Sequence, residues 1–148
     1  EVVLVSSTGC LNDENEKAQR QNFNADWAKK FRDMPWTEVV RLWNGQPVFV
    51  GSQEPERIET NYDRPSLATA LVNWSLANQD FAGDALVSLK PKLHWYAGEK
   101  DGRYMQLFRD MKDKGFIEDV HTVPEAGHRV LFDRPKELAR QLVQDLNL

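Results

Sequence analysis

Cysteine, clustered positive charge and long hydrophobic runs are all scarce in this chain. Its 148 residues include one cysteine, Cys10, which excludes an internal disulfide and favours a reducing, cytoplasmic compartment. Lysine and arginine number 19 against 23 aspartate and glutamate, so the formal net charge is −4. Binding to nucleic acid or to an anionic membrane needs clustered positive charge. The longest aliphatic run, residues 2–5, is far too short to cross a bilayer. We therefore expect neither a nucleic-acid nor a membrane partner.

Several sequence motifs of ligand binding are also missing. The three histidines and one cysteine do not form a His-x-x-x-His or Cys-x-x-Cys pair, and no acidic calcium loop occurs. Neither a Walker loop nor a Gly-x-Gly-x-x-Gly turn is present. The Gly-x-Ser-x-Gly turn that carries a nucleophilic serine in many hydrolases is absent as well. The sequence thus predicts no bound metal and no cofactor, and it offers no nucleophile elbow.

Alternating strand and helix patterns predict an α/β fold. Hydrophobic residues make up 41% of the chain and aromatic residues 10%, which is enough for a packed core. Strand-like runs cover residues 1–6, 92–97 and 118–123. Helical spacing covers 13–34, 37–43, a stretch from Pro65 through Ala77, 103–114 and 135–146, with Thr37 as the expected N-cap of the second helix. Residues 46–64 read as a loop with at most a short helix around 55–60.

Two loops that follow predicted parallel strands carry the main candidates for chemistry. Asp101 follows the strand at 92–97, and His128 follows the strand at 118–123. Ligands and catalytic groups gather at the carboxyl ends of parallel strands, so this pair is well placed to meet. Asp101 would accept the proton of one imidazole nitrogen, and the other nitrogen would act as a base. His94 and His121 lie within strands, where a structural role is the better interpretation, and Cys10 is expected to be an inert thiol.

Motifs spread along the chain resemble those of a known enzyme family. They are Asn15-Glu-Lys-Ala-Gln-Arg20, Gln46-Pro-Val-Phe49, Ser75-Leu-Ala-Asn-Gln79 and Tyr96-Ala-Gly-Glu-Lys-Asp101. The chain resembles the carboxy-terminal portion of the 2-succinyl-6-hydroxy-2,4-cyclohexadiene-1-carboxylate synthases of menaquinone biosynthesis, which have the α/β-hydrolase fold. The resemblance implies the last three parallel strands of that fold with their helices, plus a helical lid. By domain, it implies a core strand and loop at 1–11, the lid at 12–83, and a carboxy-terminal core with the acid and histidine loops at 84–148.

The resemblance also implies a function and a set of site residues. The family eliminates pyruvate as a carbon–oxygen lyase and uses a Ser-Asp-His triad, here Asp101 and His128 with a serine outside this chain. Arg20 and Trp43 would contact a small carboxylate substrate, and either Arg57 or Arg64 would add a further basic contact. The expected partner is a missing amino-terminal half of the same protein, without which the chain is predicted to be inactive. Two alternatives stay open: a carboxylic ester or thioester hydrolase with the same triad, and a non-catalytic binding domain.

Overall fold

The computed structural model describes residues 1–8, 11, 13–80, 83–89, 92–118 and 120–147. The chain divides into two compact units, and each is described by itself. The first unit contains Glu1–Thr8, Gly45–Pro55 and Gly83–Leu148. The second contains Gly9–Asn44 and Glu56–Ala82.

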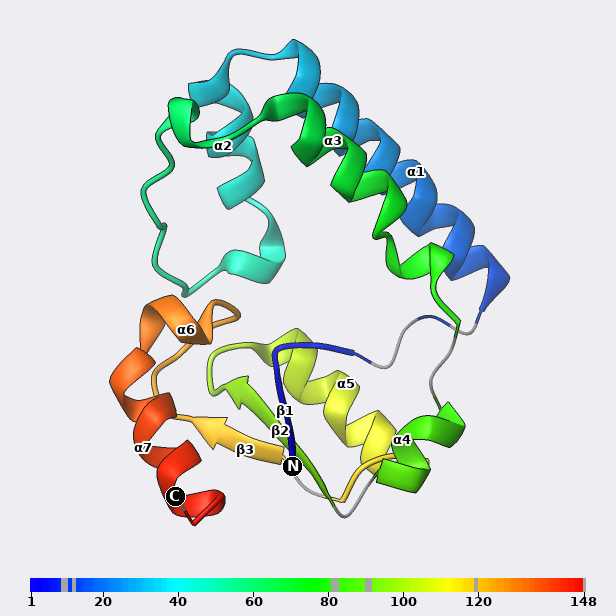
Figure 1. Ribbon diagram of the computed structural model, residues 1–148, viewed down its shortest axis with the longest axis vertical. Coiled ribbons are helices and arrows are strands. Elements are labelled where there is room, and N and C mark those ends of the chain that lie inside the picture. The colour runs from blue at the N-terminus through cyan, green and yellow to red at the C-terminus, as the bar shows by residue number, and fades with distance from the viewer. Residues whose placement is uncertain (9–10, 12, 81–82, 90–91, 119, 148) are drawn as a thin grey trace. The chain divides into compact units, whose positions relative to one another are not determined.

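A three-stranded parallel sheet forms the centre of the first unit (Figure 1). Its strands are β1 (Val2–Val5), β2 (Leu93–Gly98) and β3 (Val120–Val123), in the order β1-β2-β3. Leu4 pairs with Trp95 across the first ladder, and Tyr96 pairs with His121 across the second. Because all three strands run in the same direction, the loops that follow β2 and β3 leave the sheet at the same edge. The predicted α/β class and its three strands are confirmed.

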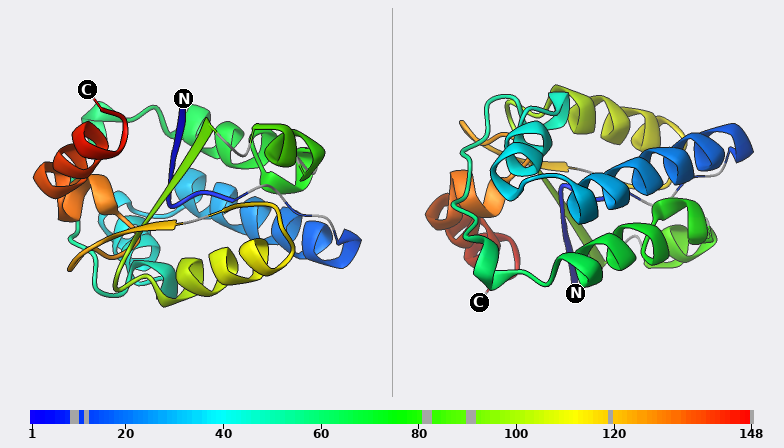
Figure 2. Two further views of the ribbon diagram at one scale, coloured as in Figure 1. Left: turned by 90° about the horizontal axis from the view of Figure 1, so that it is seen from below. Right: turned by 90° about the horizontal axis from the view of Figure 1, so that it is seen from above.

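Helices pack on both faces of this sheet (Figure 2). On one face, Tyr96 and Val123 form a buried cluster with Leu138 of α7 (Pro135–Asp145). On the other face, the ring of Trp95 meets Phe108 of α5 (Gly102–Asp113) edge to face, with ring centroids 5.4 Å apart. Trp95 and Tyr96 are adjacent in β2 and therefore point to opposite faces, which explains why large apolar side chains stand next to each other here instead of alternating with polar ones.

The described residues of the first unit also form the short helices η1 (Pro47–Phe49), α4 (Gly83–Leu89) and α6 (Val130–Asp133). The helices α5 and α7 confirm the predicted ones, whereas the sequence patterns did not predict η1, α4 or α6. The four residues of α6 are too few for a helical period to show. This helix is formed instead by packing, because Val130 belongs to the buried cluster beneath it.

The second unit is helical. It consists of α1 (Glu14–Asp33), α2 (Trp36–Asn44), η2 (Glu59–Asn61), α3 (Arg64–Asn73) and η3 (Leu76–Asn78). The helices α1 and α3 lie side by side (Figure 1), and Asn24 of α1 donates a hydrogen bond to the carbonyl of Leu71 at 2.9 Å. A hydrophobic cluster in this unit is formed by the buried residues Trp27, Phe31, Trp36 and Val39.

Two predicted helix boundaries are wrong. Thr37 is not an N-cap, because α2 already begins at Trp36 and the carbonyl of Pro35 accepts its first hydrogen bonds, from Glu38 and Val39. The helix predicted from Pro65 through Ala77 ends at Asn73. The side chain of Ser75 then accepts a hydrogen bond from the backbone of Ala77 at 3.2 Å and starts η3. Local side-chain bonds of this kind compete with continuation of a helix.

None of the helices in the described parts of the chain is long and apolar enough to cross a membrane.

Tyr96 sets an alkaline limit on the stability of the folded state. Burial raises the pKa of Tyr96, and the hydrogen bond from its hydroxyl to Asp145 Oδ2, at 2.7 Å, raises it further. Above pH 10 or so, tyrosine ionises in the unfolded chain but not in the folded one, so the free energy of unfolding falls as pH rises. We expect Tyr96→Phe to be less stable than the wild type at pH 8 and to lose less stability between pH 8 and pH 11.

Urea unfolding of the full-length protein, the polypeptide that contains these 148 residues, measures this difference in stability. Equal losses of stability for the wild type and Tyr96→Phe over that interval would contradict the assignment.

Candidate functional site

Asp101 stands in the loop between β2 and α5 and is almost fully buried, with 4% of its surface exposed. It is the N-cap of α5, since its Oδ1 accepts a hydrogen bond from the backbone N–H of Tyr104 at 3.2 Å. Its own N–H donates to the carbonyl of Gly98 at 3.0 Å and closes a tight turn. The cap fixes one carboxylate oxygen and directs the other away from the helix.

That second oxygen of Asp101 faces the imidazole of His128. Its Nδ1 lies 2.8 Å from Asp101 Oδ2. A carboxylate can only accept hydrogen bonds, so Nδ1 carries the proton and Nε2 is left as the basic nitrogen. The imidazole is 20% exposed, compared with 2% for the Asp101 side chain. The structure therefore brings together the two residues that the sequence singled out, with the acid enclosed and the histidine accessible.

Two aromatic side chains contact the imidazole of His128. The ring of Tyr104, in the first turn of α5, has its centroid 4.6 Å from that of the imidazole. The ring of Phe49, the last residue of η1, has its centroid 5.9 Å away. These contacts restrict the ring rotation that would break the bond to Asp101.

The acid and histidine loops also meet through their backbones. The N–H of Glu99 donates to the carbonyl of Val123 at 3.0 Å, and the N–H of Lys100 donates to the carbonyl of Ala126 at 2.8 Å. Gly98 allows this approach, because a Cβ atom there would lie 2.1 Å from the carbonyl oxygen of Gly127. The short distance between Asp101 and His128 thus depends on a glycine at the end of β2.

The four predicted substrate-binding residues all belong to the second unit. Arg20, on α1, is half-buried, and its guanidinium carbon lies 5.7 Å from the centroid of the Phe23 ring. Its buried Nε has no hydrogen-bond partner among the described residues. Trp43, on α2, packs edge to face against Trp27 and Phe31, at 5.0 and 5.5 Å between ring centroids.

Arg57 and Arg64 have different surroundings. The guanidinium of Arg57 donates to Asn44 Oδ1 at 3.0 Å, and the carbonyl of Arg57 accepts from Trp36 Nε1 at 2.8 Å. Arg64 donates from Nε to the carbonyl of Phe31 at 2.7 Å, and its terminal nitrogens bond two further carbonyls at the end of α1 and the carboxylate of Glu59. These contacts give the guanidinium of Arg64 a role in holding the end of α1.

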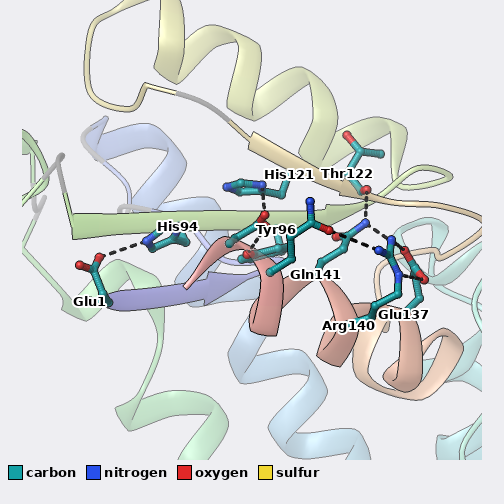
Figure 3. A network of polar contacts seen from close by, with 10 residues as sticks. Glu1, His94, Tyr96, His121, Thr122, Glu137, Arg140 and Gln141 are labelled. Atoms are coloured by element: carbon teal, nitrogen blue, oxygen red, sulfur yellow. Dashed lines mark hydrogen bonds and ion pairs between the residues drawn. The ribbon is translucent and has the colours of Figure 1, made fainter. Parts of the chain in front are cut away.

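His94 and His121 lie within the sheet and take part in a different network (Figure 3). His94 Nε2 lies 3.0 Å from Glu1 Oε2, and His121 Nδ1 lies 3.0 Å from Asp145 Oδ2. The ring of His121 stacks on that of Tyr96, with centroids 4.7 Å apart. These contacts fit the structural interpretation of both histidines. Cys10 lies outside the described residues.

The sequence analysis gave no role to Phe49 or Tyr104, which contact the histidine. Tyr104 stands three residues after the capping Asp101, a position in the first helical turn that could have been linked to the site. Phe49 is the last residue of the Gln-Pro-Val-Phe motif, which carried the resemblance without an assigned function. The contact of Phe49 with His128 links that motif to the candidate site.

Comparison with known proteins agrees with the expected resemblance. No family model matches the chain. Curated 2-succinyl-6-hydroxy-2,4-cyclohexadiene-1-carboxylate synthases of Escherichia coli O157:H7 and Shigella sonnei are each 29% identical to it, over 98% of the chain. The alignments cover 58% of these relatives, so the chain spans somewhat more than half of their length. The sequence similarity predicted from the motifs is confirmed.

A solved structure shares the fold. The structure of MenH from S. aureus superposes with a TM-score of 0.82 and 18% sequence identity, covering 98% of this chain and 57% of the other. The chain has the fold of the carboxy-terminal portion of an α/β-hydrolase, with a parallel three-stranded sheet and its helices. The predicted fold class is confirmed.

Proposed function

We propose that this chain supplies the acid and the histidine of a Ser-His-Asp triad in a carbon–oxygen lyase. The enzyme would release pyruvate to form 2-succinyl-6-hydroxy-2,4-cyclohexadiene-1-carboxylate, the compound named in the curated relatives. The observation that carries the proposal is the 2.8 Å contact between His128 Nδ1 and the buried carboxylate of Asp101. The serine would come from a segment outside these 148 residues.

The geometry suits proton transfer. Asp101 holds the proton on Nδ1 of His128 and stabilises the imidazolium that forms when Nε2 takes a proton. With its proton passed to Nε2, the serine oxygen removes a proton from the substrate carbon. The electron pair of that C–H bond forms a new carbon–carbon double bond as the C–O bond to the pyruvate unit breaks. His128 then returns its proton to the departing group.

Substrate recognition would fall to the helical unit. We propose that this unit, Gly9–Asn44 with Glu56–Ala82, provides most of the lid predicted at residues 12–83, with Arg20 and Trp43 contacting a carboxylate-bearing substrate. The unpartnered Nε of Arg20 supports this role, because a guanidinium with an unused donor can bind a carboxylate. Either Arg57 or Arg64 would add a further basic contact; Arg57 donates to Asn44 Oδ1, and Arg64 bonds three backbone carbonyls and a carboxylate.

Arg20→Ala should weaken substrate recognition more than catalysis. Loss of one charge-assisted contact of about 1.5–3 kcal/mol corresponds to a rise in KM of roughly 10- to 150-fold, with kcat nearly unchanged. Arg20→Lys keeps the charge but not the planar fork, so its KM should lie between those of the wild type and Arg20→Ala. Steady-state kinetics of the full-length protein measures both constants. An unchanged catalytic efficiency in Arg20→Ala would show that Arg20 does not contact the substrate.

A carboxylic ester or thioester hydrolase would use the same pair, so substrate tests separate the two reactions. The full-length protein is given the pyruvate-bearing precursor in one assay and an activated short-chain ester in another. The lyase proposal predicts pyruvate release without a burst of alcohol from the ester. A burst, which reports an acyl-enzyme, would favour the hydrolase. Activity in neither assay would favour a non-catalytic binding domain.

A further inference from the structure

Two segments of the first unit that are distant in sequence, residues 52–53 and 127–133, meet at one buried carboxylate. Asp133, the last residue of α6, is 7% exposed and accepts three hydrogen bonds. Its Oδ2 receives the hydroxyl of Ser52 and the backbone N–H of Gly127, both at 2.8 Å. Its Oδ1 receives the backbone N–H of Gln53 at 2.6 Å. The carboxylate thus ties the loop after η1 to the loop that carries His128.

Ser52 extends this connection to the other side of the histidine. Its Oγ donates to Asp133 and at the same time accepts the backbone N–H of Arg129 at 3.0 Å. The amides immediately before and after His128, those of Gly127 and Arg129, are therefore held by one Asp133–Ser52 pair. Bonds from amides to a buried carboxylate are charge-assisted and stronger than neutral ones.

The side chain of Arg129 adds a second tie between the same two loops. Its guanidinium donates to the carbonyl of Gln53 at 3.0 Å and lies 3.8 Å from the centroid of the Phe49 ring. Phe49 in turn contacts the imidazole of His128. The backbone and the ring of the histidine are thus restrained from the same short segment, residues 49–53.

Gly127 and Ser52 lie too close together to leave space for a side chain at position 127. A Cβ atom at Gly127 would lie 2.4 Å from Ser52 Oγ and 3.0 Å from the Ser52 nitrogen. A shift of the histidine loop away from Ser52 and Asp133 would break the hydrogen bonds of the Gly127 and Arg129 amides. Displacements of about 1 Å at a reacting group can cost 100-fold in rate, so such a restraint has catalytic value.

We propose that Ser52 and Asp133 are positioning residues that hold His128 in line with Asp101. In the described part of the chain neither side chain forms a hydrogen bond to the imidazole, and both act through the backbone on either side of it. The catalytic consequence rests on the proposed function, whereas the orientation of the ring does not depend on it.

The first test is Ser52→Ala in the full-length protein, with Ser88→Ala as the matched control. Ser88 also carries a hydroxyl that donates one hydrogen bond, to the carbonyl of Ala85, but it lies exposed on α4. We expect Ser52→Ala to lower kcat for pyruvate release at least tenfold with KM within about twofold of the wild type. The control should change neither constant. An unchanged kcat in Ser52→Ala would overturn the catalytic part of the proposal.

The second readout follows the histidine directly by proton NMR. The proton between His128 Nδ1 and Asp101 should give a separate low-field signal, which is assigned by its absence in His128→Gln. Ser52→Ala should broaden it or speed its exchange with water at least tenfold, while Ser88→Ala leaves it as in the wild type. A signal unchanged in Ser52→Ala would contradict the positioning role, even if thermal stability falls. This readout holds whichever reaction the enzyme catalyses.

Asp133→Asn provides an independent variant. An amide offers one acceptor oxygen where the carboxylate offers two, so at least one of the three donors must face an NH2 group. We expect a larger loss of the NMR signal than in Ser52→Ala. A folded Asp133→Asn protein with the wild-type signal would overturn the proposal. If that variant does not fold, Ser52→Ala decides the matter alone.

Discussion

Asp101→Asn is expected to lower kcat for pyruvate release by about 10⁴-fold while leaving the fold intact. The asparagine oxygen can still cap α5 by accepting the N–H of Tyr104. The atom facing His128 Nδ1 becomes an NH2 group, which favours the tautomer with its proton on Nε2. A histidine protonated at Nε2 cannot take the serine proton. Steady-state kinetics of the full-length protein and circular dichroism measure the two parts of this prediction.

Asp63→Asn is the matched control for this substitution. Asp63 also caps a helix, α3, by accepting the N–H of Ser66 at 3.1 Å, but it is exposed and forms no hydrogen bond to a histidine among the described residues. Turnover of the control should stay within about twofold of the wild type, since asparagine is an equally good N-cap. If Asp101→Asn turns over within about threefold of the wild type, Asp101 takes no part in the mechanism.

Gly98→Ala should damage both stability and turnover. The added methyl would lie 2.1 Å from the Gly127 carbonyl oxygen and 2.4 Å from that of Ala126. Both are backbone atoms, so the strain cannot be relieved by turning a side chain, and the histidine loop must move away from β2. We expect a loss of about 1–3 kcal/mol in the free energy of unfolding. We also expect kcat to fall by about 100-fold, because His128 moves with its loop.

Gly102→Ala adds the same methyl group four residues later. A Cβ atom there meets nothing within 4 Å among the described residues, and the position is the first of α5. Alanine forms helices better than glycine, so stability should be unchanged or higher by about 0.5–1 kcal/mol. Urea unfolding and pyruvate-release assays of both variants make the comparison. Equal stability and equal kcat for Gly98→Ala and Gly102→Ala would show that the close approach at Gly98 does not matter for turnover.

The meeting of Asp101 and His128 was predictable because it follows from strand direction alone. Each residue stands a few positions after an apolar, strand-like run, and adjacent parallel strands release their loops at one edge. The first strand was recognisable as a continuous apolar run, and the other two as short runs rich in aromatic or β-branched residues. The same reasoning separated His94 and His121 from the site, since both lie within such runs.

The contacts around the histidine were not predictable in this way. Ser52 and Asp133 are 81 residues apart, and neither stands in a periodic pattern that marks a buried face. Asp133 precedes Arg134 and Pro135, so the sequence indicates only a helix start there. Its three hydrogen bonds depend on how the loops fold over the sheet edge, which no local signal records.

Pyruvate release by the full-length protein, with and without His128, tests the central claim most directly. The wild type should convert the pyruvate-bearing precursor to equal amounts of pyruvate and 2-succinyl-6-hydroxy-2,4-cyclohexadiene-1-carboxylate. His128→Gln keeps a side chain that can bond Asp101 but has no basic nitrogen, and it should lose turnover by at least about 10³-fold. A wild type that releases no pyruvate, or a His128→Gln variant within about threefold of it, would contradict the account.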